Sequence, residues 1–241
     1  MKIIDAFWEK RNLGVSCAEI IIDEGDTVES IDDSIKKFNE DYIVIKVPTH
    51  MPQVNILLQD RGYKFIETTI NCANMAELPI LDNVQQRIVD SLSYSEMDDD
   101  DLKELFDEIN NDMFEDDRVS VDAFFTQNQA NNRYVGWVKD EINSNSKVYK
   151  LCFRENAVGF FILKKKSNNC LVAVLGGIYK KYRSYGFGFS MNYLQIKEGI
   201  KQKVTKIQTS FSTNNRSSTS MHFALNYRLE KQHNVFIKHK E

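Results

Sequence analysis

Residues 182–190 read YRSYGFGFS and bring Gly186 and Gly188 together in a chain that has only 10 glycines. The apolar stretch LVAVLGGI precedes this segment and an amphipathic stretch follows it, which predicts the order strand, loop, helix. The first turn of a helix has about four backbone N–H groups without an intrahelical partner, at the positive end of the helix dipole. Glycines let such a turn approach a diphosphate closely. By itself the segment fits either an incidental glycine turn or an anion site.

Two common phosphate-binding motifs do not match this segment. A Walker A loop ends in Gly-Lys-Ser/Thr, and the segment has no such ending. A dinucleotide-binding fingerprint has a third glycine three residues after Gly188, where Met191 stands. The flanking residues therefore have to decide which anion, if any, is bound.

Those flanking residues resemble the acetyl-CoA signature of the GNAT superfamily of N-acetyltransferases. The signature has an apolar strand end, a short basic link and Arg/Gln-x-x-Gly-x-Gly/Ala, and here YKKYRSYGFG follows Ile178. Residues 213–227 are similar to the closing motif of the family, with Asn215 at its start and Leu-Asn-Tyr at its end. The resemblance covers about residues 84–241. It implies an α+β fold of the three-layer GNAT type, with helices on both faces of a mixed central sheet, and acetyl-CoA as the acetyl donor.

The resemblance also implies where the donor binds. The backbone at the end of the fourth strand would receive the thioester and the pantetheine arm, the amides of the glycine turn would hold the diphosphate, and an asparagine would touch the arm. The expected cofactor-binding residues are Gly176, Gly177, Ile178, Arg183, Ser184, Tyr185, Gly186, Phe187, Gly188, Phe189 and Asn215.

The catalytic tyrosine of the family, which protonates the departing thiolate, falls on His222. A cationic histidine can donate that proton, whereas a neutral one would pack against the substrate or orient it, and both roles stay open. The glutamate base that the family often has falls near Ser210, which cannot serve as a base. A water chain, Asp117 or His233 would then have to take the proton of the acceptor. The resemblance implies no metal.

The acceptor is chosen in this superfamily by the segment between the first two strands. Here that segment contains MFEDDRVSVD, residues 113–122, followed by Tyr134 and Trp137. Together with Trp8, the run Asn-Leu-Gly at 12–14 and the phrase VIKVP, it resembles the TDP-fucosamine acetyltransferases, which acetylate a nucleotide-linked 4-amino-4,6-dideoxyhexose. The resemblance implies Arg118 as a partner of the nucleotide diphosphate and Asp117 as a partner of the sugar ammonium.

In this interpretation Tyr134 and Trp137 offer flat faces to a sugar or base, although inward packing explains the two aromatics equally well. Val119 stands where the subgroup tends to have phenylalanine, which puts the pocket shape in question. Two alternatives remain: acetylation of a peptide N-terminus, a lysine or a small polyamine, and a non-catalytic module that binds acyl-CoA.

Strand-like runs alternate with amphipathic helices along the whole chain, as expected for an α/β or α+β protein. Residues 73–83 lose this periodicity and contain Pro79, which predicts a boundary between a smaller α/β domain, residues 1–80, and the GNAT domain, residues 81–241. Residues 55–74 and 220–239 share the pattern helix, Gly or Asn cap, tyrosine, strand. If this likeness is not chance, the N-terminal domain is a degenerate partial copy of the GNAT domain and serves acceptor binding or dimer contacts.

Beyond the boundary, the pattern predicts a strand over 86–92 (QRIVDSL) and helices over 98–110 and 121–143. Strands then follow at VYKLCFR, AVGFFILKK and CLVAVLGGI, the first two joined by a turn at 155–156. A helix ending near residue 203, a strand at KIQTSFS, a helix over 215–225 and a final strand at HNVFIKH complete the pattern.

The amino-acid composition limits the kinds of partner that the protein is expected to bind. A net charge of -4 does not favour nucleic acid, and no apolar run approaches the ~20 residues that span a bilayer. The start MKIIDAFWEKRNLG lacks the apolar core of a secretory signal, so we expect a cytoplasmic protein. The four cysteines have irregular spacing, which predicts buried, reduced thiols. The expected partner is a small-molecule amine, and a homodimer is possible.

Overall fold

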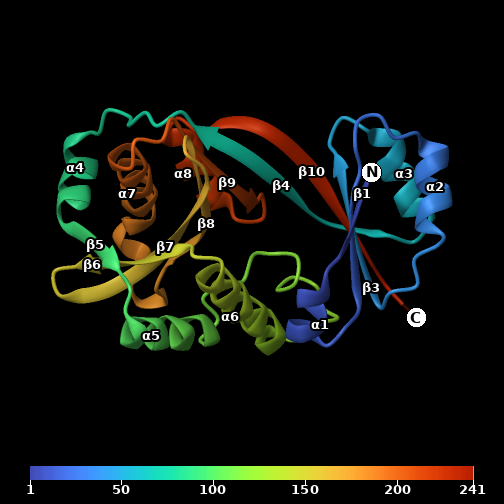
Figure 1. Cartoon of the computed structure of the whole chain (residues 1–241), viewed down its shortest axis with the longest axis horizontal. Coiled ribbons are helices and arrows are strands. Elements are labelled where there is room, and N and C mark those ends of the chain that lie inside the picture. The colour runs from blue at the N-terminus through green and yellow to red at the C-terminus, as the bar shows by residue number, and fades with distance from the viewer. Residues whose placement is uncertain (241) are drawn as a thin grey trace.

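The computed structural model describes residues 1–240, and within them the strands form one sheet of ten in the order β1-β2-β3-β10-β4-β9-β8-β7-β6-β5 (Figure 1). The strands are β1 (Lys2–Asp5), β2 (Cys17–Ile21), β3 (Tyr42–Pro48), β4 (Lys64–Asn74), β5 (Leu92–Glu96), β6 (Lys147–Phe153), β7 (Asn156–Ser167), β8 (Cys170–Ile178), β9 (Lys206–Ser212) and β10 (Arg228–His239). The helices are α1 (Phe7–Leu13), α2 (Val28–Ile35), α3 (Pro52–Asp60), α4 (Asn83–Asp90), α5 (Asp99–Asn110), α6 (Gln127–Asn143), the short 3-10 helix η1 (Lys180–Tyr185), α7 (Phe187–Lys201) and α8 (Arg216–Ala224).

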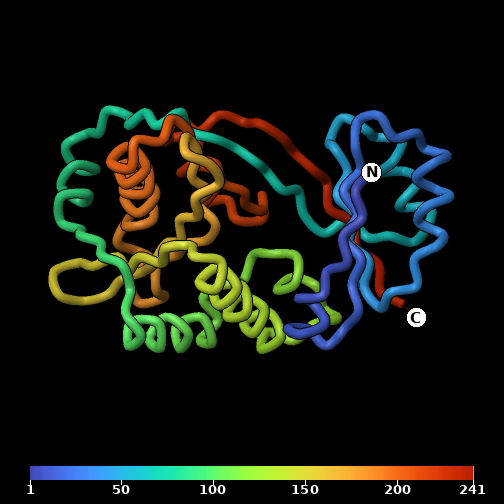
Figure 2. The backbone as a smooth tube through the Cα atoms, viewed as in Figure 1, coloured from blue at the N-terminus to red at the C-terminus, as the bar shows by residue number. Residues whose placement is uncertain are grey.

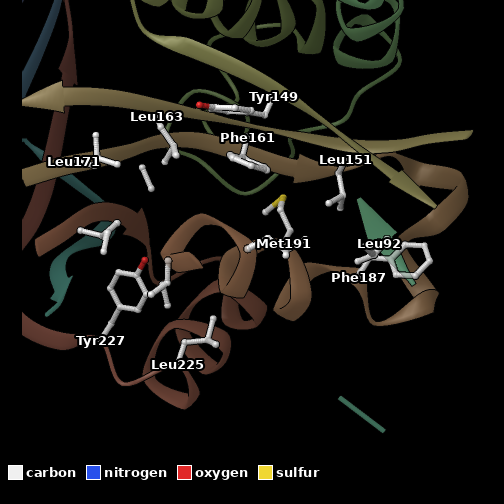
Figure 3. Close-up of a cluster of buried hydrophobic side chains, with 14 of the residues drawn as sticks. Leu92, Tyr149, Leu151, Phe161, Leu163, Leu171, Phe187, Met191, Leu225 and Tyr227 are labelled. Atoms are coloured by element: carbon white, nitrogen blue, oxygen red, sulfur yellow. The ribbon is translucent and has the colours of Figure 1, made fainter. Parts of the chain in front are cut away.

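Helices cover both faces of the sheet, as the α+β expectation requires. In Figure 1, β6, β7 and β8 separate α7 from α5 and α6. One apolar cluster fills the α7 side and contains Leu171 and Phe161 of the sheet, and Met191 of α7 lies close to Phe161 (Figure 3). A second cluster fills the other side, where Phe160 packs with Leu105 and Val138 of α5 and α6. This part of the molecule therefore has three layers.

The two ends of the chain have the same topology. In β2-α2-β3-α3-β4 and again in β8-α7-β9-α8-β10, the first two strands pair in parallel and a long third strand follows. Each of the two long strands lies beside the other unit's parallel pair: β4 pairs with β9, and β10 pairs with β3. The long strands β4 and β10 also pair with each other. Figure 2 shows these two long strands running side by side between the two ends of the molecule. The arrangement supports the proposed half-repeat.

The exchange also bears on how the chain is divided. Strand β4 precedes the predicted boundary near residue 80, yet it lies inside the sheet between β9 and β10. Residues 1–80 therefore supply one of the strands that flank β9. The division into residues 1–80 and 81–241 stays a proposal, and the two segments share one continuous sheet.

The predicted strand over 86–92 is wrong, because most of this segment forms α4. Asp82 caps that helix: its carboxylate accepts from the backbone N–H groups of Val84 and Gln85, both at 2.8 Å, and the Gln85 side chain accepts from the Asp82 N–H at 3.0 Å. This reciprocal capping box satisfies amides that a helix start otherwise leaves free. Strand β5 begins only at Leu92.

Two further boundaries differ from the predicted ones. Helix α6 begins at Gln127 rather than near 121, because the Thr126 side chain caps it by accepting from the Gln129 N–H at 3.3 Å. The turn between β6 and β7 consists of residues 154 and 155, and Arg154 adopts a left-handed φ of 56°. Both helix and hairpin are nevertheless present where the sequence pattern indicated them.

The four cysteines are free thiols; Cys17 and Cys72 are buried and the other two are half-buried. Burial raises the pKa of Cys17 and of Cys72 to about 12, which disfavours the reactive thiolate. Among residues 1–240, none of the helices is long and apolar enough to cross a membrane.

Candidate active site

The two parallel strands β8 and β9 pair at their start and then separate. Pairing extends from Cys170 to Ala173 on β8 and from Lys206 to Thr209 on β9. Beyond that point β8 pairs only with β7 and β9 only with β4. The Thr209 hydroxyl donates to the Ala173 carbonyl at 3.0 Å, at the last pair before the separation. Beyond this pair, the facing edges of β8 and β9 therefore have backbone N–H and C=O groups that make no hydrogen bonds between these two strands.

Two glycines keep the end of β8 bare. A Cβ atom at Gly176 would lie 3.1 Å from the Phe160 carbonyl oxygen and 3.2 Å from the Met191 Cε. A Cβ atom at Gly177 would lie 2.6 Å from the Met113 Cε. The two glycines thus leave the backbone bare beside the ends of these two methionine side chains, at the strand end expected to receive the acyl arm.

The glycine turn connects this strand end to a helix. Gly186 has a φ of 76°, a left-handed conformation that costs an ordinary residue about 1–2 kcal/mol, and α7 starts at the next residue. A Cβ atom at Gly188 would lie 3.0 Å from the Met221 Sδ of α8. The first turn of α7 contains no acidic residue, and lysines 180 and 181 precede it. The turn thus has amides, a positive dipole end and basic neighbours, as an anion site requires.

The side chains around the turn divide between core and surface. Phe187 is buried and Phe189 packs partly against the core, so these two residues offer only backbone groups to a ligand. Ser184 and Tyr185 are exposed, and the Tyr185 ring stacks on Phe187 with centroids 5.4 Å apart. Arg183 donates to the Met113 carbonyl oxygen and thereby ties the segment after α5 to the glycine turn.

Helix α8 starts where β9 ends. The Asn215 side-chain oxygen accepts from the Ser218 N–H at 2.8 Å and caps this helix, which leaves the Asn215 amide group free to donate. His222 lies one turn beyond Ser218 and is buried. Its ring stacks on Phe211 of β9 with centroids 4.6 Å apart, and burial lowers its pKa below the ordinary value. The side chain therefore lies beside the separated strand end as a neutral ring at pH 7.

The residues predicted to bind the acceptor lie on the other face of the sheet. Asp117 uses one carboxylate oxygen to accept from the Val119 and Ser120 amides, and its buried Oδ2 has no partner. Arg118 is buried and donates from Nη2 to Glu9 of α1 at 2.7 Å, while its Nε has no partner. Asp117 and Arg118 therefore lie at the contact between the N-terminal and C-terminal parts.

The two predicted aromatics belong to α6. Tyr134 is buried and stacks on Phe114 with centroids 4.1 Å apart. Trp137 is half-buried, and its ring lies 6.2 Å from that of Tyr134 at an interplanar angle of 27°. Tyr134 is therefore engaged in packing, whereas Trp137 retains some exposed surface.

Sequence reasoning missed the charged partners of Arg118. Glu9, Glu19 and Glu67 are all buried, and each comes from the first 80 residues. The only available signal was a glutamate inside an apolar strand pattern, as in CAEII and KFIETTIN. A lone glutamate at such a position does not tell which distant residue balances its charge.

A cavity of about 510 Å³ lies on the face of the sheet that carries Asp117 and Arg118, at the point where β8 and β9 separate. Several charged and amide side chains line it: Lys166 donates to Gln208 at 2.9 Å, and Gln208 donates to Glu230 at 2.7 Å. The lining residues are Asn71, Lys166, Val172, Gln208, Thr209, Ser210, Glu230 and Lys231. A polar molecule can reach the separated strands from this side.

The N-terminal part has no equivalent opening among its described residues. Strand β2 pairs with β3 along its whole length, and the Ile22 N–H extends the contact by donating to the Lys46 carbonyl at 2.9 Å. Helix α2 begins with Thr27 as its cap and has Glu29 in its first turn, which disfavours an anion. The opening between β8 and β9 is therefore specific to the C-terminal part.

No protein-family model and no curated protein sequence matches the chain. Solved structures do. A functionally unknown conserved protein from Staphylococcus epidermidis superposes with a TM-score of 0.65 at 10% identity, over 94% of this chain and 85% of its own. A GCN5-related N-acetyltransferase from Kribbella flavida gives 0.56 at 10% identity, over 94% and 82%.

A GCN5-related glucosamine N-acetyltransferase region of a fungal multidomain GH3 β-N-acetylglucosaminidase gives a TM-score of 0.65 at 10% identity, over 92% of this chain and 29% of that one. The chain has the GNAT fold. At such low identity the likeness concerns the fold alone. Within the GNAT fold of this chain, the residues predicted to bind the cofactor come from β8, from η1 and the start of α7, and from the residue that caps α8.

Proposed function

We propose that this protein is an acetyl-CoA-dependent N-acetyltransferase. The observation that carries the proposal is the separation of β8 and β9 beside the glycine turn at the start of α7. These features suit the two ends of one donor molecule, because unpaired strand backbone can hold an acyl arm and a glycine-rich helix start can hold a diphosphate. The donor supplies an acetyl group activated as a thioester.

The chain's own groups have separate roles in this proposal. The backbone of residues 176–178 receives the acyl arm, and the amides of residues 184–189 hold the diphosphate, with Arg183 as a nearby positive charge. The free amide group of Asn215 donates to the arm. His222 lies where the sulfur would leave, and its neutral state at pH 7 favours orientation of the substrate over proton donation.

For the acceptor we propose the amino group of a nucleotide-linked amino-dideoxy sugar. The charged and amide side chains that line the cavity at β9 support this choice, as does the structural likeness to a region described as a glucosamine N-acetyltransferase. Asp117 has a free oxygen for an ammonium group. Since Arg118 is held by Glu9, a diphosphate would have to share that guanidinium through its Nε.

The non-catalytic alternative has its own support. His222 is neutral, and Ser210 stands where the family often has its glutamate base. A module of this kind would bind acyl-CoA and release no thiol. The third candidate, acetylation of a peptide amine or a polyamine, differs from the first only in the acceptor.

One assay separates the three. The protein is incubated with acetyl-CoA and a panel of amines, and free thiol is followed with time. We expect release with nucleotide-linked aminosugars and none with peptides or spermidine. A rise of the melting temperature with acetyl-CoA, but without thiol release for any amine, would favour the binding module. Release only with peptides or polyamines would exclude the aminosugar.

A further inference from the structure

A buried cluster of charges joins the N-terminal and C-terminal parts. Glu9 accepts from Arg118 at 2.7 Å and from Arg133 at 3.0 Å, and Glu19 accepts from Lys46 at 2.7 Å. Glu67 and Asp117 belong to the same cluster, since the Asp117 charge raises the pKa of Glu67. We call these residues the inter-half cluster: Glu9, Glu19, Lys46, Glu67, Asp117, Arg118 and Arg133.

The inter-half cluster contains four carboxyl groups and three cations, so one negative charge is not balanced. Two oxygens identify where the missing partner belongs, because Glu67 Oε2 and Asp117 Oδ2 are buried and have no hydrogen-bond partner. The groups near these carboxylates that lower their pKa include the neutral hydroxyls of Ser212 and Tyr134, which do not supply the missing positive charge. Leaving an ionised carboxylate unpaired in a protein interior is costly. The group that would satisfy this cluster is a hydrogen-bond donor with a positive charge.

The sheet register places Glu67 beside the open end of β9. Asn71 pairs with Ser210 and Thr69 pairs with Ser212 across β4 and β9. Alternate residues of a strand share one face, so Glu67 lies on the same face of β4 as Asn71, which lines the cavity. Glu67 stands two residues beyond Thr69, the last residue of β4 that pairs with β9. Ser212 is the last paired residue of β9, and its hydroxyl lowers the pKa of Glu67, so the carboxylate lies next to the end of this strand.

We propose that Glu67 takes a proton from the ammonium group of the acceptor, and that the acceptor is accordingly a cationic primary amine. This inference rests on the proposed function. The ammonium gives one proton to the Glu67 carboxylate and becomes a neutral amine with a lone pair. As the C–N bond of the amide forms and the C–S bond breaks, the second amine proton goes to the departing sulfur. Glu67 then returns its proton to solvent.

The N-terminal part thereby supplies a group that β9 does not. Ser210 cannot act as a base at neutral pH, whereas Glu67 reaches the same end of β9 from the neighbouring strand β4. Because β4 belongs to the first 80 residues, this role gives the N-terminal part a catalytic contribution. Asp117, with its free Oδ2, would hold the ammonium while Glu67 takes the proton.

The surroundings of Glu67 set its proton affinity. Burial is the largest effect and raises the pKa of Glu67, and Asp117 acts in the same direction. The Ser212 hydroxyl, Arg118 and Lys46 lower it, with a smaller combined effect. Tyr134 of α6 faces the Glu67 carboxyl group. The residue paired with Glu67 on β10 is Val235, which carries no charge. A raised pKa makes the carboxylate a stronger base, which is active only above that pKa.

The test compares Glu67→Gln with the wild type in the thiol-release assay. Gln keeps the size of the side chain but cannot take the proton, so we expect kcat/KM to fall by ~10²–10⁴-fold. The wild-type kcat/KM should decrease as the pH falls through the pKa of Glu67, and this limb should disappear in the variant. Glu198→Gln is the matched control, since Glu198 is also buried but accepts from Tyr94 and Gln202 on the α7 side.

A second measurement does not depend on turnover. The carbon signals of ¹³C-labelled glutamates are titrated, and the signal that is missing in Glu67→Gln should report a pKa above the ordinary value of 4.5 that coincides with the kinetic limb. Wild-type turnover with an unchanged kcat/KM and pH limb in Glu67→Gln would overturn the role of Glu67 and leave the proposed function standing. An equal loss in Glu198→Gln would also overturn it. Absence of thiol release by the wild type with every amine would refute the proposed function, and the role of Glu67 with it.

Discussion

The Nδ1 atom of His222 lies 2.7 Å from the carbonyl oxygen of Ser218, one turn earlier on α8. A carbonyl oxygen only accepts, so Nδ1 carries a proton and donates it, and in the neutral ring Nε2 has the lone pair. Burial lowers the pKa of His222, which keeps the ring neutral at physiological pH. The bond therefore fixes both the orientation and the tautomer of the side chain that stands at the expected position of the catalytic tyrosine.

The pH dependence of stability should report this neutral state. A histidine whose folded pKa is lowered stabilises the fold above its unfolded pKa, near 6.5, and loses that contribution as the pH falls through the folded value. We expect wild-type unfolding free energy, measured in urea, to decrease from pH 7.5 to pH 5, and the decrease to be smaller in His222→Phe. An identical decrease in both proteins would contradict a buried neutral ring.

The same variant separates the two roles of His222 in turnover. If the neutral ring orients the substrate, His222→Phe should keep kcat within about tenfold of the wild type at pH 7.5, because no proton transfer is removed. A loss of more than ~10²-fold, within the range of general acid catalysis, would assign the proton to His222.

Gly188→Ala should weaken acetyl-CoA binding and leave the fold intact. The added Cβ would lie 3.0 Å from the Met221 Sδ, the flexible part of a side chain that can shift, but it would stand at the turn expected to hold the diphosphate. We expect the dissociation constant, measured by calorimetry, to rise by about tenfold, equivalent to ~1.4 kcal/mol. Gly25→Ala is the control, because its Cβ would meet nothing within 4 Å. Equal binding by the two variants would speak against the turn as the diphosphate site.

Glu9→Gln should destabilise the protein strongly. Glu9 is fully buried and is the carboxylate that pairs with both Arg118 and Arg133, so the substitution breaks two ion pairs at once and leaves Arg118 only the longer contact with Glu19 at 3.9 Å. Breaking such a buried pair costs about 3–5 kcal/mol, which urea unfolding measures. Asp140→Asn removes the exposed ion pair with Arg11 and should cost less than about 1 kcal/mol. Similar losses in the two variants would argue against a rigid inter-half cluster.

Gly136→Ala tests the contact of α1 with α6. A Cβ atom at Gly136 would lie 2.5 Å from the Asn12 side-chain oxygen, so α1 could no longer pack as closely. We expect a loss of about 1–3 kcal/mol in unfolding free energy, as for other overpacked contacts. Adding Asn12→Ala removes the obstructing atoms and should restore most of the loss. Additive effects of the two substitutions would show that the contact is not the cause.

Local patterns in the sequence predicted many of the elements. The alternation of strands and helices, the glycine turn before α7 and the hairpin between β6 and β7 follow from periodicity and from residues with restricted backbone preferences. The strand expected over 86–92 failed because a short apolar run fits either element, and the Asp82 capping box decided for a helix. Interpretation of such short runs needs the cap residue as well as the apolar pattern.

The sequence by itself determined the GNAT-type order of elements and the cofactor-binding candidates, because these depend on residues that lie close together along the chain. Tertiary structure alone decided that β4 lies between β9 and β10, that Arg118 pairs with Glu9, and that Glu67 lies beside the end of β9. The strand exchange and the pair between Arg118 and Glu9 join residues more than 100 positions apart, and no local preference specifies them. The partners of a buried charge are chosen by desolvation and packing, which act only once the sheet has formed.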